Sequence, residues 1–354
     1  MSMRAVVLEE HGDPLALESV SEPDCDPNGV VVETEACGIC RSDWHAWQGH
    51  GDWVDDRVPT GQVLGHEPVG VVREVGADVE TVDAGERVVV PFSLADGTCP
   101  ACRAGRQNYC EGATALGFGP AAPGAFAERF HVPAADVNAV PLPEDVSPVA
   151  AASMGCRFVT AFEALDTVAD VDGGDVVVVV GCGGVGLSAV QTASALGGTP
   201  VAVDVRDEPL ELAAELGAEA TFDGSDVADV PAAVRAQFGG ADVSMDALGS
   251  TETFRTAVGS LGSGGTHVQV GLTGDDDRGE VSLPVDTMVQ DDLTVTGSRG
   301  MPPRRYDEVF AMVAAGQLDP AALVTERVAL ADVPDRLAAM SDFDTVGVEV
   351  VTEC

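Results

Sequence analysis

Short apolar runs rich in valine recur through the first 155 residues, with glycine, proline and aspartate between them. This pattern is typical of β-strands joined by turns. It predicts strands at residues 4–8, 29–33, 69–75, 86–90 and 127–132. The first part of the chain is therefore expected to form a β-rich domain.

A different pattern begins near residue 175, where apolar strand-like runs alternate with helical stretches. Strands are predicted at residues 176–180, 201–204, 268–271, 293–296 and 346–351, and helices at 186–196, 208–216, 306–315 and 331–340. Such alternation favours a parallel sheet wound with helices. A chain of 354 residues is also long enough for two hydrophobic cores, so an α/β protein of two domains is expected.

A glycine-rich turn joins the strand at 176–180 to the next predicted helix. Gly181, Gly183 and Gly186 form the pattern G-x-G-x-x-G, which permits a tight turn and brings a pyrophosphate close to the N-terminus of the helix. A turn without a ligand is the alternative, because glycine is frequent in this chain, but the position between a strand and a helix favours a dinucleotide site. The expected cofactor-binding residues here are Gly181, Gly183, Gly184, Val185, Gly186, Asp204 and Arg206.

Asp204 ends the next predicted strand, at the distance where dinucleotide-binding folds place an acidic residue. Its carboxylate can accept a hydrogen bond from the adenosine ribose 2′-hydroxyl and would repel a 2′-phosphate, so NAD is expected rather than NADP. Arg206, two residues further on, weakens this preference slightly.

The charge of the chain is strongly unbalanced. There are 59 acidic residues against 18 basic ones, every basic residue is an arginine, and the formal net charge is −41. This charge excludes nucleic acid as an expected partner. The acidic residues are interspersed among periodic apolar segments, so we interpret the chain as a folded halophilic protein adapted to molar salt rather than a disordered one.

Nothing in the sequence predicts a membrane partner. The apolar run at 176–180 is far too short to span a bilayer, and the first residues lack the apolar segment of a signal peptide. A cytoplasmic protein is expected, in which the nine cysteines are metal ligands or buried side chains rather than disulfides.

Three separated residues offer the ligands of a catalytic zinc. Such a zinc is held by a few thiolate and imidazole ligands and keeps one position open. Cys40, His66 and Cys156 supply this set, in the stretches CGICRSDWH, GHE and SMGC. Each residue alone is equally typical of a buried core, and Cys37 competes with Cys40 for the role.

A second group of ligands lies in one loop rich in glycine and proline. Cys99, Cys102 and Cys110 have the spacing of a closed structural zinc site, and Asp96 stands where a fourth ligand would. A loop that keeps three free thiols without metal is the alternative, so a second zinc stays open here.

Together these motifs resemble the zinc-dependent medium-chain alcohol dehydrogenases, and the resemblance covers essentially the whole chain through CGICRSDWH, GHE, the cysteine loop, SMGC and GCGGVG. It implies a GroES-like β-rich catalytic domain formed by residues 1–157 and 298–354. It also implies a Rossmann NAD-binding domain, with a doubly wound parallel sheet, formed by residues 158–297.

The resemblance also implies roles for individual residues. Cys40 becomes the ligand beside His66 and Cys156, while Cys37 packs in the core. Glu67 matches an alternate ligand beside the zinc, and Asp43 matches the carboxylate that orients His66.

Five further residues are expected around the substrate and the cofactor. Ser42 matches the hydroxyl that takes the alcohol proton and passes it, through the nicotinamide ribose, to His45. Arg41 matches a pyrophosphate contact, and Phe92 and Trp53 are expected to line the substrate pocket. The C-terminal stretch 342–349 lacks the basic residue often found there.

The resemblance implies reversible oxidation of an alcohol to an aldehyde or ketone, with zinc and NAD as cofactors and small alcohols and carbonyls as substrates. A sugar or polyol dehydrogenase is the nearest alternative, but those proteins typically carry glutamate where this chain has Cys156. A zinc-free quinone reductase would lack the cysteine and histidine ligands. A non-catalytic NAD-binding protein is a further alternative. A homo-oligomer is expected, either a dimer or a tetramer.

Overall fold

The computed structural model describes residues 2–50, 58–274 and 276–354. The chain forms two compact units, one from Met1–Val159 and Gly300–Cys354 and the other from Thr160–Arg299. The sequence expectation placed these boundaries two residues earlier in each case. The first boundary falls inside the helix α5 (Arg157–Phe162), which continues without a break into the π-helical segment η2 (Glu163–Val168).

The first unit is built on a mixed sheet whose strands pair in the order β10-β6-β5-β3-β18-β17, with β9 also on β3. Their bounds are β3 (Val30–Ile39), β5 (Glu67–Val75), β6 (Arg87–Val89), β9 (Arg129–Val132), β10 (Val140–Pro141), β17 (Val324–Ala329) and β18 (Val348–Glu353). Valines alternate along these strands and fill a common core with side chains such as Leu64 and Phe126.

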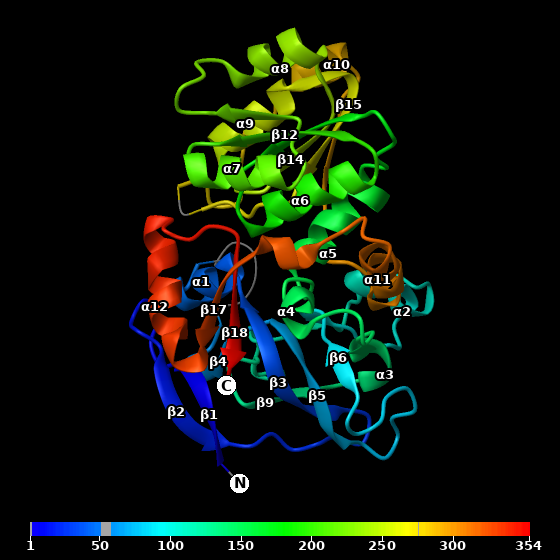
Figure 1. Ribbon diagram of the computed structural model, residues 1–354, viewed down its shortest axis with the longest axis vertical. Coiled ribbons are helices and arrows are strands. Elements are labelled where there is room, and N and C mark those ends of the chain that lie inside the picture. The colour runs from blue at the N-terminus through cyan, green and yellow to red at the C-terminus, as the bar shows by residue number, and fades with distance from the viewer. Residues whose placement is uncertain (1, 51–57, 275) are drawn as a thin grey trace. The chain divides into compact units, whose positions relative to one another are not determined.

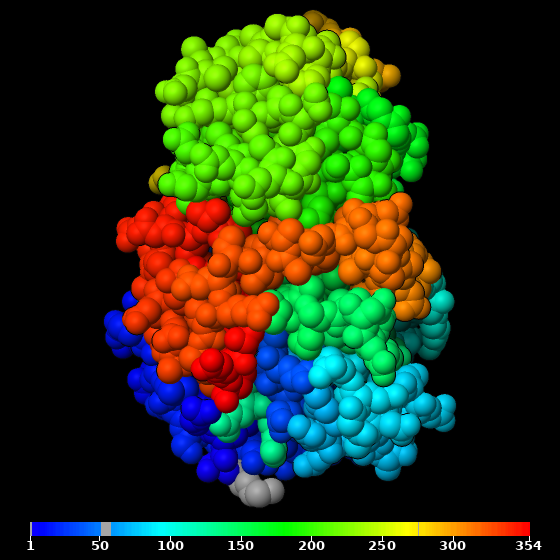
Figure 2. Space-filling model, in the orientation of Figure 1, coloured from blue at the N-terminus to red at the C-terminus, as the bar shows by residue number. Residues whose placement is uncertain are grey.

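The C-terminal strand β18 completes the sheet of this unit. It pairs antiparallel with β3, so that Val351 lies opposite Cys37 and Glu349 opposite Ile39. Figure 2 shows these last residues, in red, at the surface beside N-terminal residues, in blue. The strand that leads into Cys40 is therefore held on one edge by β5 and on the other by β18.

The remaining elements of the first unit are short. A second sheet has the order β2-β1-β4, and β7 pairs with β8. The strand bounds are β1 (Ser2–Leu8), β2 (Ala16–Ser21), β4 (Gln62–Val63), β7 (Ser93–Leu94) and β8 (Thr114–Ala115). The helices are α1 (Arg41–Gln48), α2 (Pro100–Arg103), η1 (Gln107–Tyr109), α3 (Ala135–Asn138), α4 (Pro148–Ala151), η3 (Pro303–Arg305), α11 (Tyr306–Ala314), η4 (Pro320–Leu323), η5 (Leu330–Asp332), α12 (Val333–Ala339) and η6 (Met340–Asp342).

The second unit has a fully parallel sheet in the order β13-β12-β11-β14-β15-β16. The strands are β11 (Val176–Val180), β12 (Thr199–Asp204), β13 (Ala220–Asp223), β14 (Ala241–Asp246), β15 (Leu261–Gln269) and β16 (Thr294–Gly297). The helices are α6 (Gly184–Ala195), α7 (Asp207–Glu215), α8 (Val230–Phe238), α9 (Thr251–Gly259) and α10 (Val285–Gln290).

The order of this sheet identifies where a ligand fits. Helix α6 packs on β11 and β12, whereas α9 packs on β11, β14 and β15 (Figure 1). The chain therefore leaves β11 in one direction and returns to its other side as β14, which makes the carboxyl end of β11 the switch point where α/β sheets bind nucleotides.

Two predicted elements need correction. The strand predicted at 268–271 runs instead from Leu261 to Gln269. Its second half, from Thr266, pairs with both β14 and β16, whereas the glycine-rich first half is registered to β14 through Leu261, opposite Ala241. The helix predicted at 331–340 is α12 with 3₁₀ turns on both sides. In the described part of the chain, no helix is long and apolar enough to cross a membrane.

Candidate active site

Cys40 lies where strand β3 gives way to helix α1. It caps the N-terminus of α1 in an extended conformation, and its backbone N–H donates to Asp43 Oδ2 at 3.1 Å. The Cys40 residue is 4% exposed. Because the strand is fixed by pairing on both edges, the start of the helix holds the Cys40 side chain in a set position.

Asp43 also fixes His66. Its Oδ1 accepts from the backbone N–H of Gly65 at 3.0 Å and lies 2.8 Å from His66 Nδ1, and both side chains are fully buried. A carboxylate at Nδ1 favours the tautomer in which Nδ1 carries the proton. In the neutral ring Nε2 of His66 is then an acceptor, and this atom is buried with no hydrogen-bond partner among the described residues.

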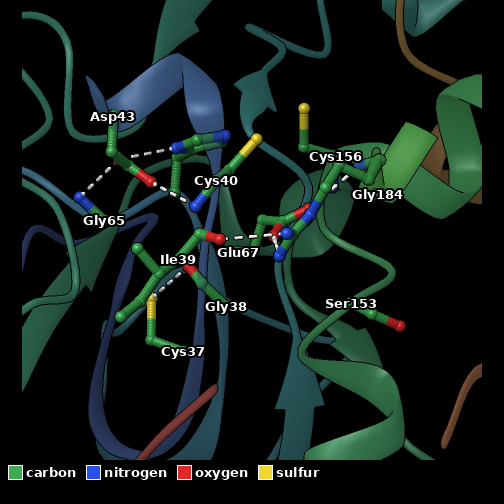
Figure 3. Close-up of polar contacts among 12 residues, drawn as sticks. Cys37, Gly38, Ile39, Cys40, Asp43, Gly65, Glu67, Ser153, Cys156 and Gly184 are labelled. Atoms are coloured by element: carbon green, nitrogen blue, oxygen red, sulfur yellow. Dashed lines mark hydrogen bonds and ion pairs between the residues drawn. The ribbon is translucent and has the colours of Figure 1, made fainter. Parts of the chain in front are cut away.

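Cys156 completes a group of three. One ligand atom from each of Cys40, His66 and Cys156 lies within 4.8 Å of the others. Figure 3 shows the sulfur of Cys37 well apart from those of Cys40 and Cys156, beside the Gly38 carbonyl, and Cys37 is fully buried in the core. Two sulfurs, an orphaned imidazole nitrogen and a closely spaced arrangement fit the donor set that zinc prefers.

The protonation of this group follows from its mutual contacts. A hydrogen bond with Cys156 lowers the pKa of the Cys40 thiol well below its usual value, against the opposing effect of burial and with help from the Arg157 charge. The same hydrogen bond, together with burial, raises the pKa of Cys156. Burial disfavours the charged form of His66, but the Asp43 and Cys40 charges outweigh it and raise the His66 pKa. Cys40 is therefore disposed to be a thiolate, the form that binds metal.

Glu67 lies next to His66 but its carboxylate is held by Arg157. It forms a buried ion pair with the Arg157 guanidinium and accepts from the backbone N–H groups of Arg157 at 2.9 Å and Cys156 at 3.2 Å (Figure 3). Burial raises the pKa of Glu67, and Arg157 partly offsets this effect. In this structure Glu67 is thus a partner of Arg157, and its expected role as an alternate ligand would require this pair to open.

Two aromatic rings lie against His66. The Phe92 ring lies edge-on with its centroid 6.3 Å from that of His66, and the Phe118 ring is tilted at 4.7 Å. Phe92 is the expected pocket residue, whereas Phe118 carries no signal in the sequence beyond being aromatic. The other expected pocket residue, Trp53, lies outside the described residues.

The residues expected to move the proton lie on α1. Ser42 is in its first turn and is half-buried. His45 is in its last turn, and its Nδ1 lies 3.2 Å from Nδ1 of His50, a partner that sequence reasoning did not identify. The pair can share one proton, since one ring must donate and the other accept.

Arg41 has a more constrained position than its match to a pyrophosphate contact suggests. Its guanidinium lies between the rings of Trp44 and Phe343, at 4.3 and 4.1 Å from their centroids, and donates to the carbonyl of Met340 at 2.8 Å. Sequence reasoning missed this sandwich because Phe343 follows η6, more than 300 residues later in the chain.

The second group of ligands also comes together. One ligand atom from each of Asp96, Cys99, Cys102 and Cys110 lies within 4.8 Å of the others. Asp96 Oδ1 accepts from the N–H groups of Thr98 at 2.7 Å and Cys99 at 3.0 Å, and these bonds lower the Asp96 pKa from its usual 3.8 to about 2.

The other oxygen of Asp96 occupies space left by a glycine. A Cβ at Gly112 would come within 2.7 Å of Oδ2. The carboxylate is therefore ionised, oriented by two backbone donors and accommodated by a residue without a side chain. Three sulfurs and one such oxygen fit a closed zinc site.

The glycines of the G-x-G-x-x-G turn are required for different reasons. Gly181 has a φ of 91°, which favours glycine, and a Cβ at Gly186 would lie 1.8 Å from the carbonyl oxygen of Gly181. A Cβ at Gly183 would meet no described atom within 4 Å. Gly183 is thus not needed by the fold, and its missing side chain leaves space for a ligand at the N-terminus of α6.

Asp204 is fixed beside this turn. Its Oδ2 accepts from the N–H of Cys182 at 2.7 Å, and its Oδ1 accepts from the N–H groups of Val205 at 2.8 Å and Arg206 at 3.2 Å. The Arg206 guanidinium is 3.7 Å from Oδ1. The acidic residue and the glycine turn therefore form one preorganised surface at the end of β11 and β12.

Comparison with known proteins gives the family. The chain matches the alcohol dehydrogenase GroES-like domain over residues 26–144 and the zinc-binding dehydrogenase model over residues 184–315. An alcohol dehydrogenase of Geobacillus stearothermophilus is 33% identical over 337 residues, which cover 95% of each chain.

Solved structures agree with this match. Alcohol dehydrogenase TADH from Thermus sp. ATN1 is 32% identical, with a TM-score of 0.90 over 99% of this chain and 100% of that chain. An NAD-dependent alcohol dehydrogenase is 28% identical, with a TM-score of 0.89 over 99% and 100%.

The chain therefore belongs to the zinc-type medium-chain alcohol dehydrogenases, which confirms the fold class and the enzyme family predicted from the sequence. Solved relatives include one described as NAD-dependent and another bound to NADP, so the preference of this chain has to be argued from its own residues.

Proposed function

We propose that this enzyme oxidises a small alcohol to an aldehyde or ketone, reversibly, with zinc held by Cys40, His66 and Cys156 and with NAD as the hydride acceptor. The observation that carries the proposal is the buried, unpartnered Nε2 of His66 beside two cysteine sulfurs. A buried polar atom without a partner is costly unless something binds it.

The residues of the chain divide the work. Cys40 as a thiolate, His66 as a neutral ring and Cys156 hold the metal, and Asp43 keeps His66 in the tautomer that leaves Nε2 available. When bound, zinc supplies a Lewis acid that lowers the pKa of the alcohol hydroxyl, and NAD supplies a hydride acceptor. Phe92 and Phe118 provide an apolar wall beside His66, which favours an apolar substituent on the substrate.

Proton removal is assigned to residues of α1. Ser42 takes the proton of the alcohol hydroxyl, and His45 carries it onward, with His50 as the neighbouring ring that accepts or returns it. His45 and His50 are part-buried, so the pair can exchange protons with solvent.

NAD is favoured over NADP because the Asp204 carboxylate lies at the end of β12, beside the glycine turn. The Asp204 oxygens are already oriented by backbone N–H groups, and their negative charge opposes a 2′-phosphate. Arg206 lies close enough to reduce this opposition without removing it.

The loop of Asp96, Cys99, Cys102 and Cys110 is proposed to bind a second, structural zinc. Its support is the ionised Asp96, whose carboxylate is oriented by two backbone donors. Protein preparations should then contain about two zinc ions per chain. The zinc of the cysteine loop should be harder to remove, and it should not take part in turnover directly.

The high negative charge is proposed to reflect adaptation to molar salt, and the enzyme is proposed to work as a homo-oligomer in the cytoplasm. Many of its carboxylates are exposed, and at ~1 M salt the Debye length of ~3 Å screens their repulsion.

The test is a substrate panel in molar KCl. NAD reduction and carbonyl-dependent NADH oxidation are followed with primary and secondary alcohols, sugars and the matching carbonyls, with and without a zinc chelator. Chelator-sensitive turnover of a simple alcohol is expected. Activity restricted to sugars would contradict the substrate assignment, and full activity without zinc would contradict the metal assignment.

A further inference from the structure

The Glu67–Arg157 ion pair touches the neighbours of all three proposed zinc ligands. Glu67 directly follows His66, and Arg157 directly follows Cys156. The Arg157 Nη1 atom donates to the carbonyl of Ile39 at 2.9 Å, and Ile39 directly precedes Cys40. One guanidinium and one carboxylate therefore join three segments that are far apart in the sequence.

The contacts of Glu67 extend this connection to the backbone. Its Oε1 accepts from the N–H groups of Cys156 and Arg157, so the turn that carries Cys156 is tied to the strand that begins at Glu67. Its Oε2 pairs with Arg157 Nη2. All of these groups lie within the first unit, and the pair is almost fully enclosed, with side-chain exposures of 5% for Arg157 and 0% for Glu67.

The surrounding backbone is shaped to this pair. A Cβ at Gly38 would come within 2.5 Å of Glu67 Oε2, 2.6 Å of the Ala152 carbonyl oxygen and 2.7 Å of Arg157 Nη2. A Cβ at Gly155 would come within 2.6 Å of Glu67 Cα. Glycine at both positions lets the strand and the turn approach the pair closely.

Stability alone does not explain a pair of this kind. Desolvation of two charges in a protein interior often equals or exceeds their attraction, and replacing such a pair with apolar residues is often neutral or stabilising. Arg157 Nε is in addition buried without a hydrogen-bond partner in the described part of the chain. A buried ion pair with this desolvation cost is best explained by the chain segments that it holds in position.

The geometry points to Arg157 as a positioning residue for the catalytic metal, which braces the segments of Cys40, His66 and Cys156 through Ile39 and Glu67. This inference rests on the proposed zinc site. It assigns Glu67 to the brace rather than to the metal in the state described here. Partners that orient metal ligands typically contribute about 10–100-fold to metal affinity or activity.

The test uses full-length protein in molar KCl with cobalt in place of zinc, because the thiolate-to-cobalt absorption bands report the sulfur ligands and their geometry. The bands that change in Cys40→Ser belong to the catalytic site, and the bands that remain belong to the cysteine loop. Arg157→Gln alone leaves a buried, unpaired carboxylate and is expected to fold poorly. The informative variants are therefore the neutral pair Glu67→Gln with Arg157→Gln, and Arg157→Lys.

A control variant separates bracing from general stability. Arg336 pairs with the buried Glu349 in the same unit and touches none of the proposed ligands. The matched neutral pair Glu349→Gln with Arg336→Gln should change resistance to urea while leaving the cobalt bands and the rate of metal release to a chelator unchanged. The neutral pair at Glu67 and Arg157 should instead shift the bands and release metal about 10–100-fold faster than the wild type.

Arg157→Lys keeps the charge but cannot hold two acceptors with one planar fork, so its release rate should fall between those of the wild type and the neutral pair. Wild-type bands and release within about 3-fold of the wild type in the neutral pair would overturn the inference, and so would an Arg157→Lys rate equal to or faster than that of the neutral pair. If Cys40→Ser itself kept the wild-type cobalt bands, the proposed zinc site would fail instead.

Discussion

Replacing Asp43 with asparagine tests whether the Asp43 carboxylate prepares His66 and Cys40 to bind zinc. The Asp43 carboxylate accepts three hydrogen bonds, from His66 Nδ1 at 2.8 Å, from Gly65 N at 3.0 Å and from Cys40 N at 3.1 Å. An amide has only one acceptor oxygen, so its NH₂ group must face a donor at one end. With its oxygen toward His66, the amide leaves the N–H of Cys40 unpaired in a fully buried position.

The magnitude follows from these contacts. A buried donor left without its partner costs about 1–3 kcal/mol. Loss of the carboxylate charge also makes His66 a weaker ligand, and the loss of such an orienting group lowers metal affinity about 10–100-fold. Asp43→Asn should therefore lose both stability and zinc affinity, whereas a carboxylate with a purely structural role would lower stability alone.

Two measurements separate these effects. Zinc affinity is obtained by competition with a chromophoric chelator in molar KCl, and stability by urea unfolding of the metal-free protein. Asp136→Asn is the matched control, because Asp136 accepts from the N–H groups of Glu80 and Thr81 and is distinct from the ligand groups. Lowered stability with zinc affinity within about 3-fold of the wild type would refute the reasoning.

Four further predictions concern other parts of the molecule. Gly183→Ala should fold normally, because its Cβ would meet only open space, and should weaken NADH binding measured by fluorescence, because that space is proposed for the cofactor; unchanged binding would contradict the proposed dinucleotide site at the N-terminus of α6. Asp204→Gly should lower kcat/KM for NAD and raise it for NADP, and an unchanged ratio would remove the basis for the NAD preference. Because backbone N–H groups lower the Asp96 pKa from 3.8 to about 2, its stabilising effect is full above about pH 4 and is lost as the pH falls through about 2. The stability difference between metal-free wild type and Asp96→Asn, measured by urea unfolding, should vanish over that range, and a pH-independent difference would contradict it. Dialysis from ~1 M to ~0.1 M KCl lengthens the Debye length from ~3 to ~10 Å and should unfold or inactivate the enzyme, so full activity in dilute buffer would disprove the adaptation to salt.

The sequence alone was sufficient to predict those parts of the candidate sites whose residues lie close together in the chain. The glycine turn follows β11 directly, so its pattern reports both the strand and the helix that it joins. The cysteines of the loop are likewise close in sequence, and their spacing alone brings them within reach of one another.

Features made by distant segments could not be predicted in this way. Arg157 follows Cys156 without any local sign that it contacts Ile39, 118 positions earlier. Phe118 approaches His66, and Phe343 approaches Arg41, because separate strands and helices fold together. Such contacts depend on tertiary packing, which a single sequence does not encode in any periodic pattern.

The bounds of strand β15 were predicted wrongly for a different reason. Its first half, at residues 261–265, is rich in glycine and serine, which have low strand propensity. The segment nonetheless belongs to the strand because Leu261 pairs with Ala241 of β14 and the residues that follow, from Thr266, pair with both β14 and β16.

The central claim is that one zinc ion held by Cys40, His66 and Cys156 is required for alcohol oxidation by NAD. The direct measurement is the zinc content and the initial rate in the same samples, in molar KCl, during stepwise removal of metal by a chelator, with Cys40→Ser in parallel. The account predicts that activity falls in proportion to the loss of one zinc per chain and returns when zinc is restored, while Cys40→Ser lacks both that zinc and the activity. Turnover that persists after that zinc is removed, or in Cys40→Ser, would contradict it.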